Sequence, residues 1–492
     1  MKHKIILSAF CIFSFCFLAN AQLPEINWAK KIHGVNDEFI TDIVTDAEGN
    51  LYIIGKFYSP AIELDYAIIE NTNTTTSDIF LAKYNTEGLL QWVTSIGGYY
   101  SETPTDMSID SKGNISLSGY TYSDEINFGA FNFITDESSG NEFLAQYASD
   151  GTFRWVKIFD FQANEFVNCI TTDHDDNIYA CGMYQTYEDE LIFEDTTLQI
   201  NSISQDIFIA KYRNDGNFIR VKLIQGQGYD DVPLECEIDE SGNLILSGIF
   251  SGHDITFDDY TIEDNQNNSS DDIFLAKMDP EGKTIWLEDI SESSASISDM
   301  TTDKSDNIYL SGAVYNNITF DSITLITENS FSWYLVKYNS NAEVQWANIP
   351  DYEIVHICAD KNNFIYATGN TFKDTIIIGS DTLITNNNSY GRSALIVKYN
   401  GSGEPVWAKA FNGSDDDFGT VITSDDFGNI YNAGHFCSDT IIFSEDTLFN
   451  LQNDNNEVYF LRTGECNTYK PVISFNDHSL LAPPAESYQW YF

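Results

Sequence analysis

Residues 45–55 read Thr-Asp-Ala-Glu-Gly-Asn-Leu-Tyr-Ile-Ile-Gly, and the pattern of this segment recurs along the chain. An Asp is followed by two variable residues, a Gly or a substitute, an alternating apolar run, and a Gly nine residues after the Asp. The spacing of nine holds in all seven copies, at Asp46 and Gly55, Asp110 and Gly119, Asp173 and Gly182, Asp239 and Gly248, Asp303 and Gly312, Asp360 and Gly369, and Asp425 and Gly434. Internal repeats of this kind indicate a repeat architecture.

A second signature follows each of the first six copies, at the same phase. In the first it reads DIFLAKYNTEGLLQW, residues 78–92. A Lys or Gln precedes a Trp by nine residues at Lys83 and Trp92, Gln146 and Trp155, Lys277 and Trp286, Lys337 and Trp346, and Lys398 and Trp407, and at Lys211 the partner is Arg220. Two fixed spacings in phase along a whole chain do not arise by chance.

Each unit translates into four antiparallel strands, A to D. The residues before the turn Asp form strand A, the D-x-x-G-N piece is a tight turn, and strand B follows with apolar residues on both faces. DIFLAKY is strand C, and strand D carries the Trp. Four such strands make a propeller blade, so the sequence predicts an all-β fold, a seven-bladed β-propeller.

The strand count also predicts how the ring closes. The seventh unit ends at Leu461 and Arg462 with no Trp strand after it, whereas an orphan D strand, residues 28–32, precedes the first A strand. We expect this N-terminal strand to complete the last blade, which leaves no open sheet edge.

The extra length of the units lies between strands B and C. A third motif recurs there, for example from Ile126 and Phe128 to Phe133 and from Ile441 and Phe443 to Leu448. It predicts an accessory hairpin in each unit. We expect the seven hairpins to surround the face from which the B–C and D–A loops emerge.

The net charge of the chain limits the kinds of partner that it can bind. The 492 residues include 75 acidic and 24 basic side chains, for a formal net charge of −51. This sign excludes an electrostatic nucleic-acid interface, because phosphates need Lys and Arg, and it disfavours docking on an anionic membrane. Two interpretations stay open: a solvated acidic surface, and cation binding.

Residues 1–21 read as a secretory signal. Lys2 and Lys4 precede an apolar run, and Ala19-Asn20-Ala21 is a cleavage motif, so we predict cleavage after Ala21 and a secreted or cell-surface protein. No other stretch has the roughly 20 apolar residues that a transmembrane helix needs. We expect a monomeric propeller.

The repeats resemble the SBBP family of bacterial β-propeller repeats, through the D-x-x-G-N turn and the D-x-F-x-A-K-Y…G…W segment. The resemblance covers residues 28–466 in units of 57–66 residues, and it implies a propeller on a secreted or surface protein without implying a reaction. Residues 467–492, with Tyr488-Gln489-Trp490-Tyr491, resemble the first strands of an Ig-like domain in secreted Bacteroidetes proteins, here a truncated stub. Such proteins often carry a type IX sorting domain after it, and we expect a truncated reading frame.

Acidic residues recur eight positions before the turn Asp, at the start of the innermost strand. They are Glu38, Glu102, Glu165, Asp231 and Asp417, with Ala295 and Tyr352 in the other two units. Because strand A lines the central channel, these carboxylates are candidates for a partial ring at one mouth that binds Ca²⁺, which prefers several oxygen ligands. The alternative is that each carboxylate accepts hydrogen bonds from loops and fastens adjacent blades.

Six cysteines follow the signal, none in a CxxC pair, so we expect no structural zinc site. Cys169 and Cys181 fall on neighbouring strands and are the expected disulfide. The recurring Trp residues are expected to pack, and Arg220, which breaks their series, is expected at a solvated edge.

The chain contains no HExxH, GxSxG or P-loop motif. We therefore predict a non-enzymatic binding or adhesion propeller, with a protein or a polysaccharide at the cell surface as partner. The alternatives are a structural spacer in a larger surface protein and a carbohydrate-active hydrolase that uses the central channel.

Overall fold

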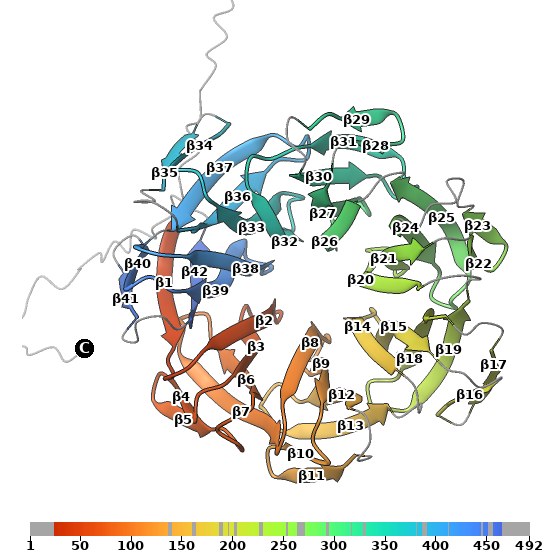
Figure 1. Cartoon of the computed structure of the whole chain (residues 1–492), viewed down its shortest axis with the longest axis horizontal. Helices are drawn as coiled ribbons and strands as arrows, with labels where there is room; N and C mark the ends of the chain where they lie inside the picture. Colours follow the sequence, from red (N-terminus) through yellow and green to blue (C-terminus); the bar gives the residue numbers. More distant parts are fainter. Residues whose placement is uncertain are drawn as a thin grey trace, which may run out of the picture.

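The computed structural model is a closed wheel of seven four-stranded blades (Figure 1). It describes residues 24–135, 140–159, 164–185, 190–194, 196–200, 204–225, 230–251, 254–262, 271–291, 295–315, 317–327, 331–379, 381–385, 391–411, 413–443, 446–450 and 456–464. The predicted signal peptide and the Ig-like stub lie outside the described residues.

The A strands surround the central channel and each pairs with the B strand of its own blade. The A strands are β2 (Glu38–Thr45), β8 (Glu102–Ile109), β14 (Asn164–Thr172), β20 (Val232–Ile238), β26 (Ala295–Thr302), β32 (Glu353–Ala359) and β38 (Asp417–Ser424). The B strands are β3 (Leu51–Phe57), β9 (Ile115–Thr121), β15 (Ile178–Gln185), β21 (Leu244–Ser251), β27 (Ile308–Val314), β33 (Ile365–Thr371) and β39 (Asn429–Phe436).

The C and D strands complete each blade outward. The C strands are β6 (Asp78–Tyr84), β12 (Asn141–Tyr147), β18 (Asp206–Tyr212), β24 (Asp271–Met278), β30 (Ser332–Tyr338), β36 (Ser393–Tyr399) and β42 (Glu457–Gly464). The D strands of blades 1 to 6 are β7 (Leu90–Gly98), β13 (Phe153–Phe159), β19 (Phe218–Ile224), β25 (Thr284–Ser291), β31 (Val344–Asn348) and β37 (Pro405–Phe411).

The N-terminal strand closes the ring as predicted. Strand β1 (Glu25–Ile32) pairs antiparallel with β42, so that Ile32 lies opposite Val458. Blade 7 is thus built from both ends of the propeller, and its outer strand precedes blade 1 in the sequence.

All seven accessory hairpins form, but on the outer rim rather than around the loop face (Figure 1). Strand β10 pairs with β7, the D strand of the preceding blade, and so covers a sheet edge that would otherwise be open. The hairpins are β4 (Ala61–Leu64) and β5 (Ala67–Glu70), β10 (Glu125–Phe128) and β11 (Phe131–Ile134), β16 (Glu190–Phe193) and β17 (Thr196–Gln199), β22 (Ile255–Phe257) and β23 (Tyr260–Ile262), β28 (Ile318–Phe320) and β29 (Ile323–Leu325), β34 (Thr375–Ile378) and β35 (Asp381–Ile384), and β40 (Thr440–Phe443) and β41 (Asp446–Phe449).

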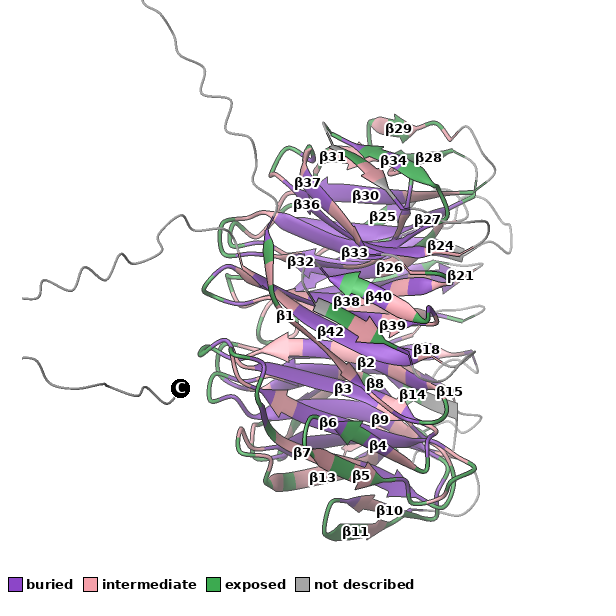
Figure 2. Ribbon diagram, turned by 90° about the vertical axis from the view of Figure 1, so that its left-hand side faces the viewer, coloured by how far each residue is buried: buried purple, intermediate pink, exposed green. Residues whose placement is uncertain are grey.

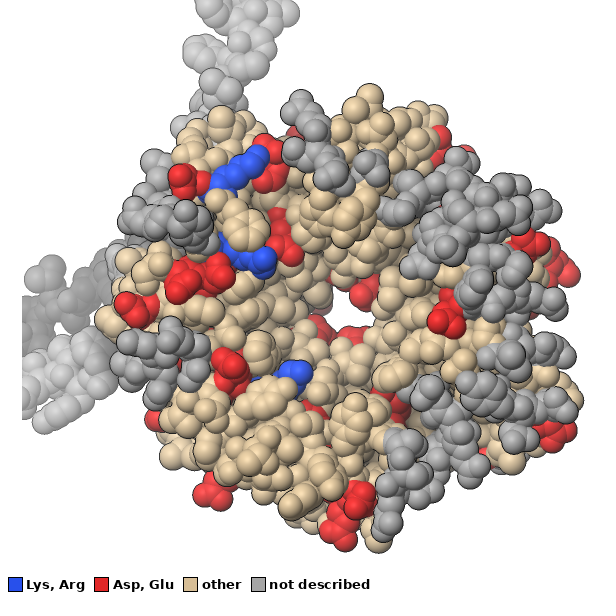
Figure 3. Space-filling model, in the orientation of Figure 1, with Lys and Arg blue, Asp and Glu red and all other residues tan. Residues whose placement is uncertain are grey.

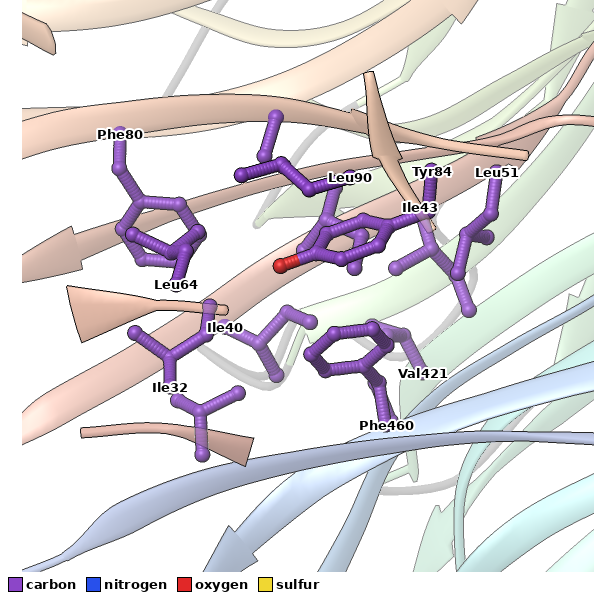
Figure 4. Close-up of a cluster of buried hydrophobic side chains, with 14 of the residues drawn as sticks. Ile32, Ile40, Ile43, Leu51, Leu64, Phe80, Tyr84, Leu90, Val421 and Phe460 are labelled. Carbon is purple, nitrogen blue, oxygen red and sulfur yellow. The ribbon is translucent and has the colours of Figure 1, made fainter. Parts of the chain in front are cut away.

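The hydrophobic core lies between the blades. Among the described residues it divides into seven clusters, one at each interface between neighbours. At the closing interface, Val421 and Phe460 of blade 7 pack against Ile40, Phe80 and Tyr84 of blade 1 (Figure 4). The inner strands are consequently buried, and exposure is concentrated in the loops and on the rim (Figure 2).

The A–B and C–D turns share one face of the wheel, here called the turn face, where the repeat residues connect adjacent blades. The Trp92 indole donates to the carbonyl of Ser149 in the next blade at 3.1 Å. Gly151, at φ +84°, lies against this ring, where an added Cβ would come within 2.7 Å of it. Corresponding indole bonds start from Trp28, Trp155, Trp286 and Trp346.

Arg220 performs the same task as these Trp residues. Its guanidinium donates to the carbonyl of Pro280 in the next blade at 2.5 Å. The position is partly exposed to solvent, in line with the expected solvated edge, and the side chain also connects two blades there.

Candidate binding site

The predicted acidic residues lie at the opposite face, here called the loop face, where the D–A and B–C connections emerge. Glu38, Glu102 and Asp417 are fully buried and Asp231 is nearly so. Glu165 lies in β14, and its side chain is outside what the structure describes. The four described carboxyls are absent from the residues that line the channel cavity.

Three of these carboxyls form a clamp with a serine after strand B. The Ser59 hydroxyl donates to Glu38 at 2.5 Å and accepts the backbone N–H groups of Val35 and Asn36 in the D–A loop. The same acid–serine clamp joins Glu102 to Ser123 and Asp417 to Ser438.

The backbone of the same residues bonds to the preceding blade. The N–H of Glu102 donates to the carbonyl of Ser77 at 2.9 Å, just before strand C of blade 1. Equivalent bonds start from Glu38, Asp231 and Asp417. These acids thus fix a loop and fasten two blades, which is the second of the two roles that the sequence left open.

Burial raises the pKa of each described acid of this set. The pKa of Glu38 rises to about 8 and that of Asp231 to about 8, and nearby carboxylates add to both shifts. For Glu102 and Asp417 the pKa rises to about 7, again because of burial. The four carboxyls belong to four different blades and do not converge on one ion, and Ca²⁺ binding by the set stays a prediction.

A different set of acids faces the channel. Asp42, Asp106, Glu235 and Asp299 occur four positions before the turn Asp, and Glu237 lies nearby. They line a cavity of about 330 Å³ within the ring of A strands. Red atoms are visible at the rim of the central opening (Figure 3).

A β-bulge explains why these acids, and not the predicted ones, reach the channel. The pairing register of every A strand shifts by one residue, as between Ile40 and Asp42 in β2. One extra residue reverses which side of the strand the following side chains face. Residues eight and four positions before the turn therefore point in different directions.

The channel acids also hold neighbouring blades together. Asp106 accepts the N–H of Ile170 in blade 3 at 2.6 Å, and Asp299 accepts the N–H of Ile357 in blade 6 at 2.5 Å. Burial raises the pKa of Asp106 and of Glu235, and the nearby Asp299 carboxylate adds to both shifts. With their oxygens occupied by backbone donors, the aspartates serve closure of the ring.

The possible metal ligands that lie close together are cysteines, and they belong to neither set of acids. Across the part of the chain that the structure describes, only Cys169, Cys181 and Cys236 form a group of three or more possible ligands within 4.8 Å. Cys169 and Cys181 lie opposite each other as expected, but both thiols are free, in contrast to the expected disulfide.

The repeat is broken on the loop face at blades 5 and 6, and a pocket of about 850 Å³ opens there. Strand β31 has five residues, whereas the other D strands have seven to nine. Tyr352 replaces the clamp acid of blade 6, and Lys373 stands where blades 1, 2 and 7 have the clamp serine. The shorter strand and the lost clamp together leave this interface uncovered.

Aromatic rings form one part of the pocket wall. Phe331 and Trp333 of blade 5 pack edge to face, with ring centres 5.1 Å apart. Phe372 is 63% exposed, and the Arg392 guanidinium lies over it at 4.5 Å. The Tyr352 hydroxyl is buried and has no partner among the described residues.

Polar groups converge on the same pocket. The Lys373 ammonium lies 2.9 Å from Asp351, and Asn370 donates to Glu353 at 3.2 Å. Lys and Arg are sparse on the face seen in Figure 3, and two basic patches lie close together over blade 6. The pocket therefore combines flat apolar faces with fixed donors and acceptors, which is typical of a ligand site.

The sequence pointed to this place without identifying the pocket. Tyr352 and the shortened segment before Asp360 were visible as departures from the repeat. Trp333 could have been found in the same way, because the other described blades have Ile, Glu, Ala or Val at that position of strand C.

No protein-family model matches the chain. An uncharacterized WD repeat-containing protein of Acanthamoeba polyphaga mimivirus is 22% identical over an alignment of 479 residues, and the match covers 78% of this chain. The chain spans 34% of that relative's length.

Two solved structures are similar to most of the chain at low sequence identity. The Neurospora crassa Pan2 WD40 domain is 7% identical, with a TM-score of 0.43, over 89% of this chain and 97% of that chain. The polysaccharide lyase Uly1 is 9% identical, with a TM-score of 0.44, over 90% of this chain and 100% of that chain. In the described residues, no helix is long and apolar enough to cross a membrane.

Proposed function

We propose that this chain is a secreted or cell-surface binding module without catalytic activity, and that it holds a polysaccharide segment in the pocket between blades 5 and 6. The observation that carries the proposal is the coincidence of the pocket with the break in the repeat. A ring of repeated units has little reason to gather four aromatic and four charged side chains around a pocket at one interface unless they serve a ligand.

The chemistry of the pocket favours a sugar ring over a purely apolar ligand. Sugar rings have apolar faces that stack on Phe and Trp, and hydroxyl groups that bond to carboxylates, amides and guanidinium groups. Trp333 and Phe372 supply the faces. Glu353, Asn370 and Arg392 supply the donors and acceptors. A volume of about 850 Å³ lies within the range of small-molecule sites.

The hydrolase alternative has less support. Catalysis would need a carboxyl pair open to substrate, whereas Asp106 and Asp299 in the channel accept backbone N–H groups of neighbouring blades. A structural spacer would leave the exposed Phe372 and the unpaired Tyr352 hydroxyl without a role.

The test is a glycan array followed by calorimetry on the purified chain. We expect saturable binding of one oligosaccharide per chain, without cleavage, and a loss of at least about tenfold in affinity when a stacking ring is removed in Trp333→Ala or Phe372→Ala. Phe427→Ala is the matched control, because Phe427 is 58% exposed and lies in the turn of blade 7 on the opposite face.

Absence of glycan binding would reject the proposal in favour of a protein partner or a spacer. Equal weakening in the Phe427 variant would show that the pocket is not the site. If the chain cleaved a bound glycan, it would be an enzyme rather than a binding module.

A further inference from the structure

The interface between blades 3 and 4 contains a cluster of three cysteines. Cys169 in β14 lies directly opposite Cys181 in β15, because the bulge after Val167 places it there. Cys236 comes from β20 of the next blade. The three side chains are 1%, 0% and 6% exposed, and their sulfur atoms lie within 4.8 Å of one another.

The rest of the ring shows how unusual this cluster is. At the position of Cys181 the other blades have Ile, Ser, Thr or Ala, and at that of Cys236 they have Ile or Met. At the position of Cys169 three blades have Asp. In blades 2 and 5 this Asp bonds to the next blade's backbone. Blades 3 and 4 therefore replace three separate repeat positions by cysteine at one interface.

Thiols at this separation match the size of a metal–thiolate centre. A metal bound to sulfur at about 2.3 Å places three sulfur ligands about 4 Å apart. Soft thiolate ligands select soft ions such as Cu(I) and Zn²⁺ over Ca²⁺ or Mg²⁺. The surrounding cluster, with Ile209, Leu246 and Phe274, is apolar.

The channel provides a route for an ion. Cys236 and its neighbour Glu235 both line the channel cavity, together with Asp106. The formal net charge of −51 favours the approach of cations to the molecule. A cation that enters the channel thus reaches the thiol cluster from the Cys236 side.

We propose that Cys169, Cys181 and Cys236 bind one soft, thiophilic metal ion between blades 3 and 4. Binding requires the ligand thiols to lose their protons, which leave to solvent through the channel. The three-sulfur set suits Cu(I), whereas Zn²⁺ takes a fourth ligand, which channel water can supply.

The test uses the full chain, reduced under anaerobic conditions and loaded separately with Cu(I) and with Zn²⁺. After desalting against a competing chelator, elemental analysis should find one ion per chain, and Cu(I) loading should add a thiolate charge-transfer absorption. Retention of either ion supports the site, and the two loadings identify which is preferred.

Two variants remove ligands without disturbing the fold. Cys181→Ser and Cys236→Ile introduce residues that other blades carry at these positions, for example Ser118 and Ile170. Both should lose the ion and retain the melting curve of the metal-free protein. Cys358→Ser is the matched control, because Cys358 is also buried and lines the channel but lies outside the cluster.

Two outcomes overturn the proposal. One is a reduced protein that retains no ion of either kind. The other is metal binding that persists in both ligand variants or is lost in Cys358→Ser. A mass 2 Da lower in the isolated protein, with a Cys169–Cys181 peptide link and no metal uptake after reduction, would assign the pair to a disulfide instead.

Discussion

The turn face and the loop face of the wheel differ in how regularly their contacts repeat from blade to blade. On the turn face the same bonds recur from blade to blade, and even the exceptional Arg220 donates to the acceptor that an indole would use. On the loop face the acid–serine clamp occurs in blades 1, 2 and 7, whereas blade 6 has Tyr352 and Lys373 in its place.

This difference indicates how the chain separates stability from function. Strict repetition on one face closes the ring, and it leaves the other face free to vary. The pocket lies where the clamp residues are replaced, at blades 5 and 6. Loops on a rigid scaffold commonly carry function for the same reason.

The largest expected loss of stability comes from removing a buried ion pair of the turn face. In blade 4 the Lys277 ammonium lies 2.6 Å from the turn residue Asp239, and both side chains are buried. Asp239→Ala leaves this ammonium without its partner and removes the acceptor for Asn243. We expect the free energy of unfolding in urea to fall by about 3–5 kcal/mol.

Asp215→Ala is the matched control. Asp215 is an exposed turn residue on the same face, and its carboxylate accepts the backbone N–H of Asn217. Its loss should cost less than about 1.5 kcal/mol. If the two variants lost equal stability, the buried ion pair would not be what holds the turn face.

An effect of similar size, seen as a dependence on pH, should appear when the clamp on the loop face is altered. The folded-state pKa of Glu38, about 8, exceeds the ordinary value of 4.5, so the folded protein holds a proton that the unfolded chain releases. This contribution is complete below pH 4.5 and is lost as the pH rises toward 8. Its slope reaches about 1.4 kcal/mol per pH unit.

Glu38→Gln should therefore match the parent protein in stability near pH 5 and exceed it near pH 8.5. The Gln oxygen can still accept the Ser59 hydroxyl, so the clamp geometry is retained. The measurement is urea unfolding at both pH values, with Glu48→Gln, at an exposed turn position, as control. Parallel pH profiles of Glu38→Gln and parent would contradict a buried, proton-binding clamp.

The regular features of the fold could be predicted from the sequence, whereas contacts between different units could not. The seven blades, their turns and the closure by β1 follow from local turn chemistry and fixed spacing, which the sequence displays directly. The rim position of the hairpins does not, because the pairing of β10 with β7 joins two different units.

Which A-strand acids face the channel could not be read from the sequence for a single physical reason. Simple alternation places residues eight and four positions before the turn Asp on the same side of the strand. The bulge between them removes this relation, so Asp42 faces the channel and Glu38 is buried at the blade interface. The cysteine cluster was missed because its three members become neighbours only when blades 3 and 4 pack together.

The smallest expected effect concerns Arg220, which breaks the Trp series of the turn face. Arg220→Trp restores the repeat, and both side chains can donate to the Pro280 carbonyl, so the free energy of unfolding should change by less than about 0.5 kcal/mol. Arg220→Ala removes the donor and should cost about 0.5–1.5 kcal/mol. If Ala and Trp were equivalent there, the bond to Pro280 would contribute nothing. The turn face would then depend on packing and on its buried Asp–Lys pairs alone.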